Sequence, residues 1–270
     1  MARAASRLPY AAGVADQLMT HVLGTSSLGE VAWVDADATP RAAGVLPLVR
    51  DGVPAIALTL DRGELATSLA AAEVVDLLIR EPRNTAEHWR PAGWRCRSRL
   101  VEDLEGEIYQ SELTLQELRR YPAARRYADS PLLAREHWWY LPRLIVELAP
   151  VVELDPPPVR SGPEDLLLVT VDRGRPVVGG ARAGSGPLMA SWGAPPAPGY
   201  GTVFGQDASF PDLEVWRTWH RPVTVTGREV VPVESLPDLD LGGPPGLWQR
   251  WRDERAFAGA CRRGIEAWGC

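Results

Sequence analysis

The sequence predicts a mainly β chain of the α+β class, with two β-sheet regions and helices inserted between their strands. Short apolar runs alternate with turn-forming residues over most of the chain, which is typical of strands in a meander. The segment 155–163 contains three consecutive prolines and separates two such regions, because proline continues neither a helix nor a central strand. We therefore expect a first domain over 1–157, with an N-terminal helix, and a second, partial domain over 164–270, with a C-terminal helix.

Composition and charge exclude several classes of function. The chain has 270 residues, 29 basic and 35 acidic, and every basic residue is arginine. It therefore has no Schiff-base lysine, no pyridoxal-phosphate anchor and no phosphate-loop lysine. The net charge of −6 argues against a general nucleic-acid-binding or anionic-membrane-binding protein. Three cysteines without a CxxC pair predict neither a disulfide framework nor a metal site. We see no apolar run of a secretory signal or membrane span, which predicts a cytoplasmic protein.

The first region reads as a helix, three strands, a second helix and further strands. Apolar residues recur at helical spacing over 8–24. Asp51-Gly52 lies between two apolar runs, which predicts a hairpin turn. Asp61 and Glu64 have the spacing of a capping box at the start of the next helix. The strands expected in this region are 30–35, 42–49, 54–60, 73–80, 94–104 and 143–154.

Helices interrupt the strands of the first region, and the second region partly repeats the strand pattern. A charged helix over 111–126 is broken at Pro122, and Ser130-Pro131 predicts the cap and first position of a helix through Trp139. The second region is expected to contain strands at 166–172, 177–181, 200–206 and 221–233, a helical segment at 212–218 and a helix within 245–269. The two regions share pattern rather than identity, so an internal duplication and two unrelated sheets are both open.

Four segments of the first region carry a family resemblance. They are Glu30-Val-Ala-Trp-Val-Asp35, Pro40-Arg41, the Asp51-Gly52 turn and Ala55-Ile-Ala-Leu-Thr-Leu60, followed by a helix of small residues. This order resembles the flavin-binding split β-barrel family, of which pyridoxamine-phosphate oxidase is a member, most clearly over 28–80 and with extension to 154. The resemblance implies a six-stranded split β-barrel, followed here by a related partial second barrel. It also implies bound flavin mononucleotide (FMN), or in some members deazaflavin F420 or haem, at the interface of a homodimer.

The resemblance also implies positions for the cofactor. The flavin phosphate would meet the end of the third strand and the start of the next helix, which here are Thr59, Arg62 and the amides near Gly63. Exposed N–H groups and the positive end of a helix dipole favour an anion, and Arg62 would add a guanidinium. Arg41 matches a basic position directed at the flavin, and Trp94 is one of several tryptophans able to stack on the ring.

Two departures from the family pattern leave alternatives open. Glu64 stands where many members carry a lysine, and a carboxylate there repels a phosphate. Ala208 replaces Arg62 in the second region, which therefore lacks a phosphate contact of its own. Such a region could serve as the internal partner that a homodimer otherwise supplies. Of the four isolated histidines, His220 and His137 lie among aromatic residues and are the candidates for a haem ligand or proton donor.

The leading hypothesis is a flavin-dependent oxidoreductase acting on a small molecule, in which the ring carries the redox chemistry and the protein holds the phosphate. The first alternative is a haem-dependent enzyme on the same fold. The second is a split-barrel protein without a redox cofactor, which serves as a small-molecule-binding or regulatory protein or as a cofactor-free enzyme. Expected partners are a small-molecule substrate and a second copy of the chain, and no metal, nucleic acid or membrane is expected.

Overall fold

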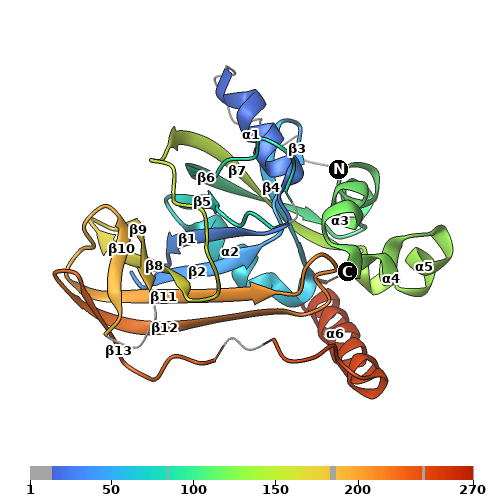
Figure 1. Cartoon of the computed structure of the whole chain (residues 1–270). Helices are drawn as coiled ribbons and strands as arrows, with labels where there is room; N and C mark the ends of the chain where they lie inside the picture. The colour runs from blue at the N-terminus through green and yellow to red at the C-terminus, as the bar shows by residue number, and fades with distance from the viewer. Residues whose placement is uncertain (1–13, 84, 183–186, 239–240, 270) are drawn as a thin grey trace.

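Two antiparallel β-sheets and a group of short helices form the chain (Figure 1). The computed structural model describes residues 14–83, 85–182, 187–238 and 241–269. The predicted mainly β fold with two sheet regions and inserted helices is confirmed. The predicted start of the first helix, near residue 8, lies outside the described residues.

The first sheet has seven strands in the order β2-β1-β5-β6-β7-β4-β3. Its strands are β1 (Gly29–Val34), β2 (Pro40–Val45), β3 (Leu48–Arg50), β4 (Val53–Thr59), β5 (Val75–Ile79), β6 (Ala92–Asp103) and β7 (Arg143–Glu153). The strand expected over 42–49 divides into β2 and β3 around Pro47, which has no backbone N–H. Because β2 and β3 form the two edges of the sheet yet follow one another in the chain, the sheet curls round until its edges approach. Asp51 (φ 50°) and Gly52 (φ 76°) form the predicted turn between β3 and β4.

The second sheet closes into a barrel of six strands. They are β8 (Asp165–Asp172), β9 (Arg175–Arg182), β10 (Met189–Gly193), β11 (Gly199–Ala208), β12 (Trp216–Thr226) and β13 (Glu229–Pro232). The sequence predicted a partial barrel of four strands, with no strand at β10 and a single strand over 221–233. A turn at Gly227 (φ 59°) divides that segment, so that β13 pairs with both β12 and β10 and completes the ring. The helix expected over 212–218 is not formed; the segment is a loop that leads into β12.

Short helices occupy the connections within the first region, and a long helix ends the chain. In chain order, the helices of the described residues are α1 (Val14–Thr25), η1 (Leu60–Arg62), α2 (Gly63–Ala71), η2 (Tyr109–Leu113), α3 (Thr114–Arg120), η3 (Pro122–Ala124), α4 (Arg125–Ala128), α5 (Pro131–Glu136), η4 (Trp138–Tyr140) and the long helix α6 (Leu247–Trp268). The hydroxyl of Ser130 accepts from the backbone N–H of Leu133 over 3.3 Å, as the predicted cap requires. Among the described residues, no helix is long and apolar enough to cross a membrane.

Apolar side chains fill the interior of each sheet and the space between them. The largest core lies inside the first sheet and extends under α1, the helical insert and α6. A smaller core fills the barrel. A third joins the two sheets and consists of Ala32, Ala42, Leu78, Leu167, Val169 and Phe204. The second sheet is therefore packed against the first over β1, β2 and β5.

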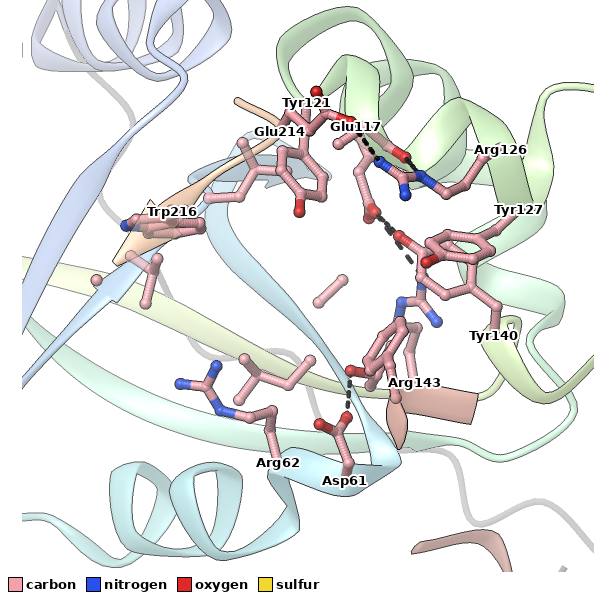
Figure 2. Close-up of a pocket in the computed structure, with 18 of the residues that line it drawn as sticks. Asp61, Arg62, Glu117, Tyr121, Arg126, Tyr127, Tyr140, Arg143, Glu214 and Trp216 are labelled. Carbon is pink, nitrogen blue, oxygen red and sulfur yellow. Dashed lines mark hydrogen bonds and ion pairs between the residues drawn. The ribbon is translucent and has the colours of Figure 1, made fainter. Parts of the chain in front are cut away.

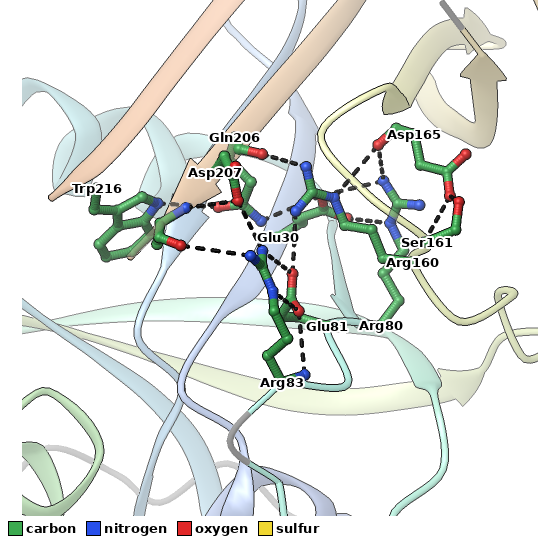
Figure 3. Close-up of polar contacts among 11 residues, drawn as sticks. Glu30, Arg80, Glu81, Arg83, Arg160, Ser161, Asp165, Gln206, Asp207 and Trp216 are labelled. Carbon is green, nitrogen blue, oxygen red and sulfur yellow. Dashed lines mark hydrogen bonds and ion pairs between the residues drawn. The ribbon is translucent and has the colours of Figure 1, made fainter. Parts of the chain in front are cut away.

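A buried ion pair of the first sheet lies at this interface and binds groups of the second sheet (Figure 3). Glu30 of β1 and Arg80, just after β5, are each 2% exposed, and Nε of Arg80 donates to the Glu30 carboxylate over 2.5 Å. Gln206 of β11 donates to the same carboxylate over 3.2 Å and accepts from the indole N–H of Trp216 over 3.2 Å. Arg80 also donates to the backbone oxygen of Asp165 in β8 over 3.0 Å. A single carboxylate of the first sheet thus holds groups from both sheets.

The proline-rich segment between the sheets is anchored by the same network. Arg160 is 3% exposed and donates to Glu81 over 3.1 Å and to the backbone oxygen of Gln206. Arg83 donates to both oxygens of Glu81 over 2.6 and 2.9 Å and to Asp207 over 2.8 Å. Segment 155–163 therefore contains no helix or strand, as its prolines predict, but it is pinned between the sheets at Arg160.

We predict that replacing Arg80 by methionine lowers the free energy of unfolding by about 3–5 kcal/mol, because the Glu30 carboxylate is left buried without its ionic partner. Urea unfolding followed by circular dichroism measures the change. The control is Arg175→Met, which breaks an ion pair to Glu73 whose side chains are 55% and 62% exposed. That change should cost less than about 1 kcal/mol. Equal losses in the two variants would show that the buried pair does not hold the sheets together.

Candidate functional site

A cavity of about 370 Å³ lies where the first sheet, the helical insert, the loop before β12 and α6 meet (Figure 2). The insert connects β6 to β7 and folds over the end of the sheet, so it brings α3 and η4 to the cavity. The aromatic residues of the wall are Tyr121, Tyr127, Tyr140, Trp216 and Phe257. The charged residues are Asp61, Arg62, Glu117, Arg126, Arg143, Glu214, Arg250, Asp253 and Glu254. The wall therefore combines aromatic rings with groups of both charges.

Arg143 forms the inner end of the cavity. It begins β7 opposite Thr59 of β4, and its guanidinium lies 3.7 Å from the ring centroid of Tyr109 and 4.2 Å from that of Tyr140. Nη1 donates to the backbone oxygen of Pro142 over 3.1 Å, whereas Nε and Nη2 have no hydrogen-bond partner among the described residues. Burial opposes its charge, but the adjacent tyrosines and the carboxylate of α3 raise the pKa of Arg143. This guanidinium is therefore charged and completely buried.

Glu117 of α3 faces Arg143 across this inner end. Its Oε1 lies 3.9 Å from Nη2 of Arg143 and accepts a hydrogen bond from the hydroxyl of Tyr140. Burial and the charge of Glu117 raise the pKa of Tyr140 well above its ordinary value, so this hydroxyl keeps its proton. The Glu117 carboxylate therefore has a hydrogen-bond donor in Tyr140, whereas two nitrogen atoms of the Arg143 guanidinium lack an acceptor among the described residues.

The mouth of the cavity is held together by ion pairs from three elements. Glu214, in the loop before β12, lies 2.9 Å from Nη2 of Arg250 on α6 and 3.9 Å from Nη2 of Arg126 on α4. These arginines are 41% and 36% exposed, so solvent screens the pairs. The mouth thus differs from the inner end, where the charges are buried.

The corner predicted to hold a phosphate borders the cavity but is covered by α6. Thr59 and Arg62 line the cavity, and Arg62 is exposed with no ion pair among the described residues. The hydroxyl of Thr59 donates to Asp61 over 2.5 Å rather than facing an open anion site. A Cβ at Gly63 would lie 2.8 Å from the indole nitrogen of Trp268. The capping box is also not formed, since α2 has no side-chain cap.

The end of α6 packs closely on η1. A Cβ at Gly264 would overlap the backbone oxygen of Leu60, so only glycine permits this approach. One turn earlier, the thiol of Cys261 lies 3.6 Å from Asp61, and burial followed by that carboxylate raises the pKa of Cys261 to about 12. The thiol is therefore protonated and is not poised as a nucleophile.

The other sequence candidates lie away from the cavity. Trp94 is 3% exposed in the core of the first sheet, and Arg41 is paired with Asp35 over 2.7 Å. His220 is exposed on β12 near Arg41; burial of part of its ring and then the charge of Arg41 lower its pKa. Nδ1 of His137 lies 3.0 Å from the backbone oxygen of Leu133. Its ring packs on the side of Tyr127, a residue of the cavity wall, and does not itself line the cavity. The structure therefore brings Thr59 and Arg62 together, and Arg41 with His220, but not all of them.

Sequence analysis missed Arg143, Glu117 and Trp216 as site residues. Arg143 had one usable signal, which is its position as a single arginine at the start of a strongly apolar strand. A charged residue in such a strand is buried only where other groups compensate its charge, so its surroundings are expected to be polar. Glu117 had none, since it is one of several charges in a polar helix. Trp216 belonged to a segment interpreted as a helix, so its place beside the first sheet was not foreseen.

Comparison with known proteins adds little to this description. No protein-family model and no curated protein matches the sequence. Among solved structures, the chain is similar to a conserved hypothetical protein from Mycobacterium tuberculosis, with 15% identity and a TM-score of 0.38 over 55% of this chain and 87% of that one. It is similar to the haem storage protein HutZ from Vibrio cholerae, with 12% identity and a TM-score of 0.37 over 52% and 94%. A haem-binding protein from Mycobacterium smegmatis matches over 95% and 99%, with 12% identity and a TM-score of 0.34. Likeness at this level carries no conclusion about a ligand.

We predict opposite effects for alanine at two glycines of α6. Gly264→Ala should lower the free energy of unfolding by about 1–3 kcal/mol, because the methyl group forces the helix away from Leu60. Gly259→Ala should stabilise by up to about 1 kcal/mol, since the nearest atom to its Cβ is a flexible arginine tip at 3.5 Å and alanine favours the helix. Urea unfolding of both variants tests the packing of α6, and a stabilising Gly264→Ala would contradict it.

We predict that the pKa of His220 lies below the ordinary value of a histidine, because burial of part of the ring and the charge of Arg41 disfavour the imidazolium. Arg41→Gln should raise the pKa of His220 toward its ordinary value. Arg175→Gln, a change elsewhere on the surface, should leave it where it was. NMR titration of the histidines measures the pKa of His220 in the native protein and in both variants. An unchanged pKa in Arg41→Gln would show that the two groups are not neighbours.

Proposed function

We propose that the chain binds a small organic molecule with a conjugated ring system in the cavity at the end of its first sheet. The supporting observation is that aromatic side chains from the helical insert, the start of β12 and α6 converge on one cavity of about 370 Å³. Cavities of about 300–1,000 Å³ with aromatic walls and a few polar groups are the usual form of small-molecule sites. The sheet end supplies the rest of the wall through apolar residues of β2 and β4.

A larger groove of about 950 Å³ beside the proline-rich segment is a weaker candidate. Its buried carboxylate, Asp76, is already held by Arg95 through hydrogen bonds of 2.7 and 2.8 Å. Another of its carboxylates, Glu73, is paired with Arg175 over 2.7 Å. These paired groups have no remaining need of a ligand, in contrast to the inner end of the smaller cavity.

FMN is the first candidate ligand, because Thr59 and Arg62 border the cavity where the family resemblance places the phosphate. The residues present do not fit a phosphate at that corner, however. The Asp61 carboxylate accepts the Thr59 hydroxyl, and Trp268 lies against Gly63 at the start of α2. The phosphate of F420 would need the same corner, so F420 does not fit there either. We therefore derive no redox step.

Haem is the second candidate ligand, and a ligand without redox chemistry is the third. No histidine is among the described residues that line the cavity, so neither His137 nor His220 is placed to coordinate an iron there without movement. Binding without a redox cofactor agrees best with the cavity. Because Glu214 and Trp216 come from the second region, we propose that this region closes the site within one chain; a homodimer remains an expectation.

We predict that the uncharged fluorophore N-phenyl-1-naphthylamine binds saturably and that Trp216→Ala weakens its affinity by about tenfold, through loss of stacking area and of the contact to Gln206. Trp248→Ala is the matched control, because Trp248 is 78% exposed and does not line the cavity. Fluorescence titration measures both. Equal effects of the two substitutions, or no saturable binding, would refute the proposed site.

Absorbance spectra then separate the candidate ligands. Purified protein titrated with FMN or with haemin shows shifted flavin bands or a Soret band if either is bound. Displacement of the fluorophore by the same compound places that compound in the cavity. A spectral response that does not displace the fluorophore would assign the cofactor to another part of the chain.

A further inference from the structure

The inner end of the cavity holds buried charges of both signs. Arg143 and Glu117 are 0% and 5% exposed, and Arg120, which lies behind Glu117, is 6% exposed. Burial lowers the pKa of Arg120 to about 10, which still leaves it charged at neutral pH. These charges lie in a region of low dielectric, where they interact strongly. A second buried carboxylate, Asp103, is 5% exposed and lies opposite Arg143 in the β6–β7 pair, but it accepts from the backbone N–H groups of Ile108 and Tyr109.

The acceptors around these two arginines are unequally distributed. Arg120 donates to the backbone oxygens of Leu23, Pro47 and Gln116 and to the Gln116 side chain, so its donors are used. Among the described residues, Arg143 has one hydrogen bond, to Pro142, and is otherwise flanked by tyrosine rings. Buried donors almost always find a partner, and each that lacks one costs free energy. Arg143 is thus the group at which an acceptor is missing.

The remaining carboxylates near the cavity do not supply that acceptor. Glu117 receives the Tyr140 hydroxyl and lies 3.9 Å from Arg143, beyond hydrogen-bond distance. Glu214 is held at the mouth by two arginines, and Asp61 accepts from Thr59 and Cys261. Each of these carboxylates therefore has other partners, and the unsatisfied guanidinium lies at the buried end of the cavity.

We infer that the ligand is an anion, and that its negatively charged group, of carboxylate or sulfonate size, lies at Arg143 while its ring system lies against the aromatic wall. This inference rests on the proposed function. It assigns the anion to the inner end of the cavity and not to Arg62, the exposed guanidinium at the corner suggested by the sequence. Because rings flank the guanidinium and close off Nε and Nη2, the inference requires the Tyr140 ring to move aside when the anion binds.

The test compares two fluorophores that differ in charge. 8-Anilinonaphthalene-1-sulfonate carries a sulfonate, and N-phenyl-1-naphthylamine has the same ring system without it. We expect the sulfonate compound to bind the native protein more tightly, by about tenfold or more, as a charge-assisted hydrogen bond would give. In Arg143→Met this preference should disappear while the uncharged compound still binds. Arg62→Met removes the same charge at the exposed corner and should leave most of the preference.

Two milder variants keep the test decisive if Arg143→Met does not fold, which circular dichroism and thermal unfolding establish. Arg143→Lys retains the charge and should keep part of the preference. Glu117→Gln still accepts from Tyr140 but removes the opposing charge, so the ratio of sulfonate affinity to uncharged-compound affinity should rise severalfold.

The outcomes separate this inference from the function on which it rests. If neither fluorophore binds saturably, the proposed function fails. If both bind with equal affinity, or if Arg62→Met abolishes the preference and Arg143→Met does not, the cavity binds a small molecule but Arg143 does not select an anion. Loss of both fluorophores alike in a folded Arg143→Met would likewise reduce Arg143 to a structural role.

Discussion

The arrangement of this chain depends on one buried carboxylate, that of Glu30, which holds Arg80 of the first sheet and Gln206 of the second. Gln206 in turn accepts from the indole of Trp216, so the position of this cavity-lining ring follows from an ion pair in the sheet interface. The approach is close: a Cβ at Gly44 would overlap the Gln206 side chain and lie 2.8 Å from the Trp216 ring. A charge buried to join two sheets thus also shapes the wall of a binding cavity, and the two properties are coupled.

Burial divides the charged groups of the cavity into two kinds. The ion pairs at the mouth lie at the surface, where water and salt reduce their interaction to about 1 kcal/mol or less. The groups around Arg143 are closed off, and there the same charges interact several times more strongly. An inventory of lining residues would describe a cavity of mixed and nearly balanced charge. Weighted by burial, the inner end decides the charge preference, and the mouth contributes mainly to how the ends of α4, α6 and the loop before β12 are held.

The sequence predicted most strands and helices of the first region at the right place along the chain, because local signals govern them: the Asp51-Gly52 turn, the Pro122 break and the Ser130 cap all act within a few residues. It failed where long-range pairing decides. Nothing local distinguishes one strand over 221–233 from the β12–β13 hairpin that closes the barrel. The candidate site divides in the same way. Thr59 and Arg62 were candidates because the family resemblance places a phosphate at this strand-to-helix junction, and both border the cavity. Arg143 and Glu117 become neighbours only when the helical insert folds over the sheet.

The C-terminal helix explains why the anion site moves from that junction to the interior. A helix N-terminus binds an anion through exposed amides and the helix dipole, and both require open access. Here Trp268 lies against Gly63 and Gly264 lies on Leu60, so α6 occupies the approach to α2, and the neighbouring Asp61 adds a negative charge. Because α6 covers the junction and Asp61 offsets its positive field, an anion would gain little binding free energy there. Arg143 lies on the neighbouring strand, opposite Thr59 in the sheet. Unlike the junction, its guanidinium has unpaired donors and a charge that solvent does not screen.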